Sequence, residues 1–168
     1  MTQAPAKGSA AIAAFAGFLA LASAMGVGRF VYTPILPFMM EGAGLTPTQM
    51  GAIASANFLG YLAGAIVATL PAARAARPSV IVAMLALSAA TGAGMAYAGS
   101  LAAFSALRFV SGVASAMVFV GASAAVVQAL ARRGRLALSS LLYAGVGGGI
   151  AASAAMVALV VAQGGGWR

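Results

Sequence analysis

The chain has 168 residues, of which 63% are hydrophobic and 6% are charged, and its formal net charge is +8. So little charge excludes an ordinary soluble domain, and a mean hydropathy of +1.05 indicates an integral membrane protein. The chain has no cysteine, no histidine and a single acidic residue, Glu41, which excludes disulfides, thiolate or imidazole metal sites and paired-carboxylate catalysis within it. We therefore expect no enzymatic activity, no catalytic residue, no metal and no cofactor.

Hydrophobic segments divide the chain into five expected membrane-spanning helices, each near or above the roughly 20 residues that a span needs. The first covers residues 10–38. A signal peptide is the competing interpretation there, because Lys7, an apolar run and the residues Ala22, Ser23 and Ala24 imitate its three regions. Apolar character continues past that cleavage site, which favours a span. The other four spans are expected at residues 50–70, 79–98, 101–130 and 136–162.

The connections between the spans carry turn and capping signals. Residues 41–49 read EGAGLTPTQ and are expected to form the first loop. Thr46, Pro47 and Gln49 form a capping-box pattern with proline at the first helical position, so a helix should begin there. Gly99 and Ser100 predict a tight turn between the third and fourth spans.

The positive charge is better explained by membrane topology than by a nucleic-acid partner, because the basic residues lie between apolar runs. With five spans, one side of the membrane receives Lys7, Arg74, Arg77, Arg132, Arg133 and Arg135. The other side receives Glu41, the turn at Gly99, and the terminal Trp167 and Arg168. The positive-inside rule then places the N-terminus in the cytoplasm.

Two arginines, Arg29 and Arg108, lie inside the first and fourth spans, where a charge is costly and usually lines a water-filled path or has a partner. At about 1.5 Å of rise per residue, both sit at a similar depth in the outer half of the bilayer. The stretch around Arg29, residues 26–37, also carries glycines and prolines, which open the helix ladder so that neighbouring helices must supply substitutes. An anionic substrate, a carboxylate from another part of the protein or backbone carbonyls must neutralise the arginines. The alternative is that they snorkel to the interface or tie helix ends together.

Other polar residues share helix faces or membrane depth with these arginines. The expected substrate-path residues are Arg29, Tyr32, Thr33, Asn57, Tyr61, Arg108, Ser111, Gly112 and Ser115. For Asn57 the alternative is an interhelical hydrogen bond, and for the serines it is helix packing. Small residues at close helical spacing let backbones approach in lipid, which gives a helix-packing set of Gly51, Gly60, Gly64, Gly145 and Gly149.

Two stretches carry a resemblance to a known family. FSALRFVSG, residues 104–112, is similar to the fourth-helix pattern l-x-x-x-R-x-x-q-G of the major facilitator superfamily, with Ser111 in place of the usual glutamine. GVGRFVYTPILPFM followed by LTPTQMGAIASANFLGYLAGA resembles the bacterial YbfB/YjiJ branch of that superfamily. The resemblance implies an all-α integral membrane fold, in which the five helices form most of an N-terminal six-helix bundle of a multi-pass bacterial inner-membrane protein.

The resemblance also implies a function: secondary active transport of a small solute, with an anion suggested by the arginines. Partners would be membrane lipid, the solute, and either a missing C-terminal half or a second copy, because the family has twelve helices. Residues 1–168 would then be an incomplete N-terminal domain, and we expect this chain alone not to transport. The loop ATLPAARAARP lacks the family's aspartate, and the glycines near Gly145 lack the proline of the antiporter motif, which weakens the case for antiport. A non-transporting membrane scaffold or interaction protein is the alternative function.

Overall fold

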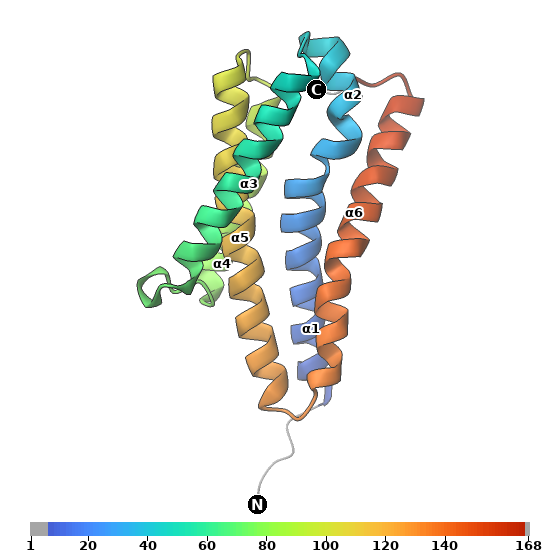
Figure 1. Cartoon of the computed structure of the whole chain (residues 1–168). Helices are drawn as coiled ribbons and strands as arrows, with labels where there is room; N and C mark the ends of the chain where they lie inside the picture. The colour runs from blue at the N-terminus through green and yellow to red at the C-terminus, as the bar shows by residue number, and fades with distance from the viewer. Residues whose placement is uncertain (1–6, 167–168) are drawn as a thin grey trace, which may run out of the picture.

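The structure, a computed structural model, describes residues 7–166, with side chains from Ala10 onward. Within this range all regular elements are helical, and five helices are long and apolar enough to cross a membrane. Each span runs opposite to the one before it, so that together they form an up-and-down bundle (Figure 1). The predicted all-α membrane fold with five spans is confirmed. Trp167 and Arg168 lie outside the described residues.

The first span is a continuous helical rod that changes its winding in the middle. It consists of α1 (Lys7–Leu21), a π-helical segment η1 (Ala22–Phe30) and α2 (Tyr32–Ala43). The amide of Val31 donates to the carbonyl of Gly26 at 3.0 Å, which is the spacing of five residues that defines a π-helix. The glycines and prolines of this stretch therefore produce a local rewinding of the helix and not a break in it.

The end of α2 differs from the prediction. The helix continues to Ala43, so Glu41 lies in its last turn rather than in a loop, with its side chain exposed. Gly44 ends the helix because it adopts a left-handed backbone conformation with φ of 64°.

The second span, α3 (Pro47–Thr69), begins with the predicted capping box. The hydroxyl of Thr46 accepts a hydrogen bond from the amide of Gln49 at 3.3 Å, and the Gln49 side chain accepts one from the amide of Thr46 at 2.9 Å. The helix thus starts earlier than the hydrophobic run alone indicated, because the cap and Pro47 define its first turn.

Thr46→Ala should lower the free energy of unfolding by about 1 kcal/mol, because it removes this cap. The change can be measured by detergent-induced unfolding in mixed micelles, followed by circular dichroism. Thr69→Ala is the control, since Thr69 bonds only within its own helix, to Ile66, near the far end of α3. An equal loss for both variants would contradict the assigned cap.

The remaining spans are α4 (Pro78–Met95), α5 (Leu101–Ala131) and α6 (Ser139–Ala162), and short 3₁₀ turns (Pro71–Ala73 and Leu136–Leu138) precede α4 and α6. Ser100 caps α5, since its hydroxyl accepts a hydrogen bond from the amide of Ala103. The centre of the bundle is α5, which contacts α1, η1, α3 and α4.

Glycines set the close crossing of α3 and α5. A Cβ atom on Gly60 would overlap the carbonyl of Phe109, and one on Gly64 would meet the backbone of Val113 at 2.6 Å. Such contacts let two helix backbones approach without a side chain between them. Gly51 was expected to share this role, but it is exposed and a Cβ there would meet nothing within 4 Å. It therefore makes no helix contact within the described residues.

The same arrangement recurs where α6 crosses the first span. Cβ atoms on Gly145 and Gly149 would overlap the carbonyls of Phe18 and Ala22, which are also one helical turn apart. On the first span, Gly26 of η1 lies against the backbone of Gly149. The two crossings bring η1 close to both α5 and α6, and so fix where the π-helical segment sits.

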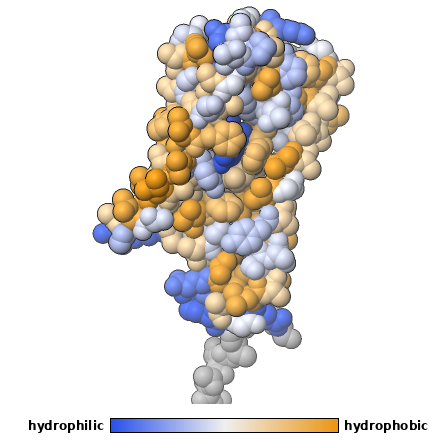
Figure 2. Space-filling view, viewed as in Figure 1, coloured by the Kyte–Doolittle hydropathy of each residue, from blue (hydrophilic) through white to orange (hydrophobic). Residues whose placement is uncertain are grey.

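Most of the described basic residues outside the spans gather at the end of the bundle where α1 begins (Figure 1). This end holds Arg74, Arg77, Arg132, Arg133 and Arg135, while Glu41 lies at the opposite end. Figure 2 shows hydrophilic residues at both ends and a mainly hydrophobic middle, as a membrane protein requires.

Candidate functional site

A small pocket of about 70 Å³ between the first span, α3 and α5 brings together both intramembrane arginines. Arg29 and Arg108 are only 9% and 6% exposed, so the charges are almost fully removed from the surface. Figure 2 shows a strongly hydrophilic spot recessed in the hydrophobic middle of the face between α3 and α6. The pocket is lined by Arg29, Phe30, Tyr32, Thr33, Ala54, Asn57, Phe58 and Arg108.

Arg108 reaches from α5 to the backbone of the first span. Its Nη1 donates to the carbonyl of Gly28 at 3.1 Å, and its Nη2 donates to the carbonyl of Arg29 at 2.8 Å. Its Cζ also lies 4.8 Å from the ring centroid of Tyr32. Backbone carbonyls are thus the one of the three expected partners that the structure provides for Arg108, and the ring of Tyr32 is an additional partner.

The carbonyls that Arg108 contacts belong to a stretch whose helix ladder is interrupted. Pro34 has no N–H, so the carbonyl five residues before it, that of Arg29, has no π-type donor there. The hydroxyl of Ser111 adds a second donor to Gly28, at 3.1 Å. The carbonyl of Arg29 thus receives from a neighbouring helix the donor that the proline cannot supply, which is how membrane helices tolerate proline.

Asn57 and Tyr32 also direct their polar atoms into the protein. The side-chain amide of Asn57 donates to the carbonyl of Arg108 at 2.8 Å, and the hydroxyl of Tyr32 donates to the carbonyl of Met50 at 3.2 Å. Asn57 therefore makes the interhelical hydrogen bond that was the alternative to a role in the path. Both side chains line the pocket, yet these donors are already engaged.

Arg29 is held in a different way, by aromatic rings. Its Cζ lies 3.9 Å from the ring centroid of Tyr61, 4.9 Å from that of Phe58 and 5.5 Å from that of Phe30. Its Nε is buried with no hydrogen-bond partner among the described residues. The only acidic residue of the sequence, Glu41, is exposed near the end of α2 and forms no ion pair within the described range. Arg29 is thus a buried cation without a carboxylate.

Cation–π contacts and hydrogen bonds leave different parts of an arginine side chain free to bind a ligand. Cation–π contact uses the face of the planar guanidinium, whereas its N–H donors lie in the plane and point outward from the edge. The rings around Arg29 therefore offset part of its burial cost and still leave the edge free to bind an anion. Both Nη groups of Arg108 are occupied by carbonyls, while its Nε is buried without a hydrogen-bond partner among the described residues.

The contact between Arg29 and Tyr61 gives a direct test of this arrangement. Tyr61→Phe should keep the stability of the parent, because the ring carries the attraction to the cation. Tyr61→Leu should lower the free energy of unfolding by about 1–2 kcal/mol, because it removes the nearest ring. In the Arg29→Gln background the same Tyr61→Leu change should cost less. An equal cost in both backgrounds, measured by unfolding in mixed micelles, would contradict a cation–π contact.

Two of the predicted path residues, Gly112 and Ser115, lie in the packed interior between helices. A Cβ on Gly112 would overlap the carbonyl of Asn57, so this glycine is part of the α3–α5 crossing. Ser115 is fully buried, and its hydroxyl donates to the carbonyl of Gly112 within its own helix at 2.9 Å. Neither lines the arginine pocket. The physical reason is that the face of α5 bearing Arg108 is the face that packs on α3 and η1.

Sequence reasoning missed the aromatic residues Phe30 and Phe58 and the role of Pro34. A signal for the ring cluster was present, because Phe58 and Tyr61 are three residues apart and therefore share one face of α3. Phe58 is 60% exposed, which is consistent with a lipid-facing residue as well. Only the fold brings that face beside Arg29.

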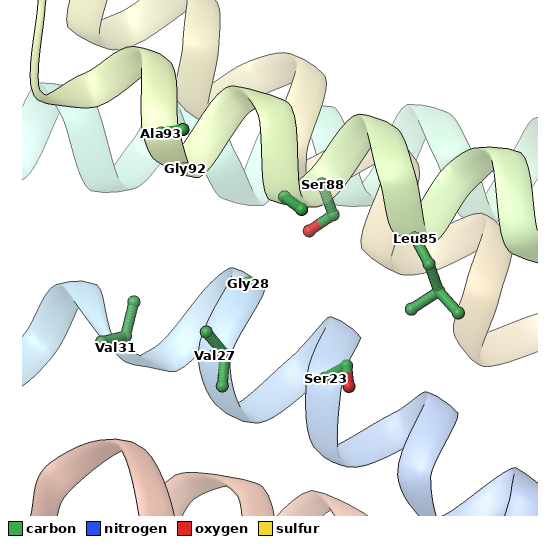
Figure 3. Close-up of a pocket in the computed structure, with 9 residues that line it drawn as sticks. Ser23, Val27, Gly28, Val31, Leu85, Ser88, Gly92 and Ala93 are labelled. Carbon is green, nitrogen blue, oxygen red and sulfur yellow. The ribbon is translucent and has the colours of Figure 1, made fainter. Parts of the chain in front are cut away.

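A larger cleft of about 580 Å³ lies between η1 and α4, and it differs in chemistry from the arginine pocket. Its walls are apolar or small residues, and Ser88 points its hydroxyl toward the first span, near Gly28 (Figure 3). This hydroxyl is buried without a hydrogen-bond partner among the described residues. No charged residue is among those that line this cleft.

A family model described as "Uncharacterised MFS-type transporter YbfB" matches residues 21–167. The chain belongs to this family. The predicted membership of the major facilitator superfamily, in its YbfB-like branch, is therefore confirmed. No curated protein and no solved structure gives a significant match. This MFS-type transporter chain is a multi-pass membrane protein, and its arginine pocket lies entirely within the matched region.

Proposed function

We propose that this MFS-type chain takes part in secondary active transport and binds a small anionic solute at Arg29. The observation that carries the proposal is the guanidinium of Arg29, which donates no hydrogen bond within the described residues and whose Nε is buried, whereas both Nη groups of Arg108 are engaged. A buried arginine at membrane depth costs about 3 kcal/mol on insertion scales, and the cation–π contacts return part of that cost. An anion on the free edge would supply a charge-assisted, bidentate pair.

The depth and the walls of the pocket support a place in a solute path. Secondary transporters bind their substrates near the bilayer midplane, beside interrupted helices whose irregular backbone lines a cavity. Here the π-helical segment η1 adjoins the pocket, Arg29 lies near the middle of its span, and Arg108 lies about two helical turns from the start of α5. The basic loops at one end favour an N-terminus in the cytoplasm of a bacterial inner membrane.

The secondary mode is supported by the sequence, which contains no phosphate-binding loop for ATP. In proteoliposomes that hold this chain together with the second half of a twelve-helix transporter, we expect solute flux to follow an imposed ion gradient without nucleotide. Flux that requires ATP would contradict this part of the proposal.

The anion-binding part is tested by equilibrium binding to the chain in lipid nanodiscs. A panel of small carboxylates, inorganic anions and neutral solutes is titrated against the parent and Arg29→Gln. We expect at least one anion to bind the parent about 100-fold more tightly than the variant, because about 3 kcal/mol of charge-assisted hydrogen bonding is lost. Arg135→Gln is the matched control, since Arg135 is an exposed arginine in the loop before α6.

A non-transporting scaffold predicts a different result for the same variants. Neutralising Arg29 would then change the assembly of the protein in the membrane and leave every solute titration unaltered. That outcome would contradict the proposed function.

A further inference from the structure

We propose that the solute is a monocarboxylate with an apolar body, which deepens the proposed function and rests on it. The proposal follows from counting which polar groups around the pocket are still free. Two guanidinium groups line the pocket, but they are not equivalent, because both Nη groups of Arg108 already donate to backbone carbonyls and those of Arg29 do not.

The engaged groups are Arg108, Asn57 and Tyr32. Arg108 donates to the carbonyls of Gly28 and Arg29, while Asn57 and Tyr32 donate to carbonyls of neighbouring helices. A ligand could recruit any of these donors only by breaking a buried hydrogen bond, which leaves a carbonyl without a partner. They are therefore poor candidates for solute contacts.

The free groups beside Arg29 are the edge of its own guanidinium and the hydroxyl of Thr33, and the Nε of Arg108, although also without a partner, is buried. Thr33 is exposed, and its hydroxyl makes no hydrogen bond within the described chain. One planar fork and one adjacent hydroxyl match a single carboxylate, whose two oxygens accept in the plane of the guanidinium. A phosphate or sulfate would present more charged oxygens than this fork and this hydroxyl can pair.

The rest of the pocket wall is apolar. Phe30, Phe58 and Ala54 complete the lining, and Phe58 extends to the exposed side of the site. A second carboxylate would lie against these groups without a partner, at a cost of several kcal/mol. An apolar or aromatic body would instead be favoured there, by about 25 cal/mol for each Å² of apolar surface it buries.

The size of the pocket agrees with a solute whose carboxylate lies inside it and whose apolar body lies outside. Its volume of about 70 Å³ is enough for a carboxylate head but not for a whole solute. The body must therefore leave the pocket along its apolar side. Figure 2 shows hydrophobic residues around the recessed hydrophilic spot, which gives such a body a surface to follow.

Isothermal titration of the chain in nanodiscs with matched probes tests the proposal. Benzoate carries the head and the body, acetate carries the head alone, benzamide is the neutral isostere, and terephthalate adds a second carboxylate to the same ring. Inorganic phosphate is the fifth probe. We expect benzoate to bind at least about 10-fold more tightly than each of the others, which corresponds to about 1.4 kcal/mol. Arg29→Gln should abolish this preference, and Arg135→Gln should keep it.

The possible failures separate the two proposals. Terephthalate or phosphate binding more tightly than benzoate, with Arg29 required, would overturn the monocarboxylate and leave anion binding at Arg29 standing. Acetate binding as tightly as benzoate would overturn the apolar body alone. If benzamide binds as tightly as benzoate, or if benzoate still binds to the Arg29→Gln variant, both proposals are overturned.

Discussion

Gly60→Val is expected to separate α3 from α5 and to cost about 3 kcal/mol or more of the free energy of unfolding. Gly60 has no room for even one methyl group, because a Cβ atom there would overlap the backbone carbonyl of Phe109. Backbone atoms cannot rotate away as a flexible side chain can, so the helices themselves must move. The shift would also break the hydrogen bond from Asn57 to the carbonyl of Arg108, which is worth a further ~1 kcal/mol.

The matched control is Gly51→Val in the same helix. A side chain at Gly51 meets nothing within 4 Å, so its stability should stay within about 0.5 kcal/mol of the parent. Both variants are compared by detergent-induced unfolding in mixed micelles, followed by circular dichroism. Similar stability for the two would show that α3 and α5 do not cross at Gly60.

Arg108→Gln is expected to lower the free energy of unfolding by about 2 kcal/mol. The change removes two charge-assisted hydrogen bonds to the carbonyls of Gly28 and Arg29, each worth about 1.5–3 kcal/mol. Relief from burying a charge offsets part of that loss. The single variant mixes these two terms, so a second substitution is needed to isolate the hydrogen bonds.

Pro34→Ala isolates the contribution of these hydrogen bonds, because it restores a backbone N–H near the carbonyls to which Arg108 donates. We expect Pro34→Ala to stabilise the Arg108→Gln protein by about 1 kcal/mol more than it stabilises the parent. The double-mutant cycle is measured by the same unfolding assay. Strictly additive effects would contradict the view that Arg108 replaces the hydrogen bond lost at Pro34.

The fold was largely predictable from the sequence because its signals are local. Long apolar runs mark the spans, and Thr46 with Gln49 marks the start of α3, since a cap depends only on residues three apart. The end of α2 was missed, because Gly44 stops the helix only after the turn that contains Glu41. The glycines near the helix crossings were recognised by spacing, but spacing could not separate Gly60 from the exposed Gly51.

The candidate site was predictable in its members but not in their roles. The cost of intramembrane charge identifies Arg29 and Arg108 in any such sequence. Which partner each one finds depends on contacts between residues about 80 positions apart, such as Arg108 with the carbonyl of Gly28. Whether rings or carbonyls hold a charge decides whether its edge remains free, and that distinction exists only in the folded bundle.

The most direct test of the central claim is a distance measurement between a bound carboxylate and Arg29. Solid-state NMR in bilayers can detect dipolar coupling between ¹⁵N-labelled arginine side chains and the ¹³C-labelled carboxylate of benzoate. We predict a coupling that corresponds to N–H···O bonds of about 2.8 Å, lost in Arg29→Gln and kept in Arg135→Gln. Coupling that survives Arg29→Gln, or its absence while benzoate saturates the protein, would contradict an anion site at Arg29.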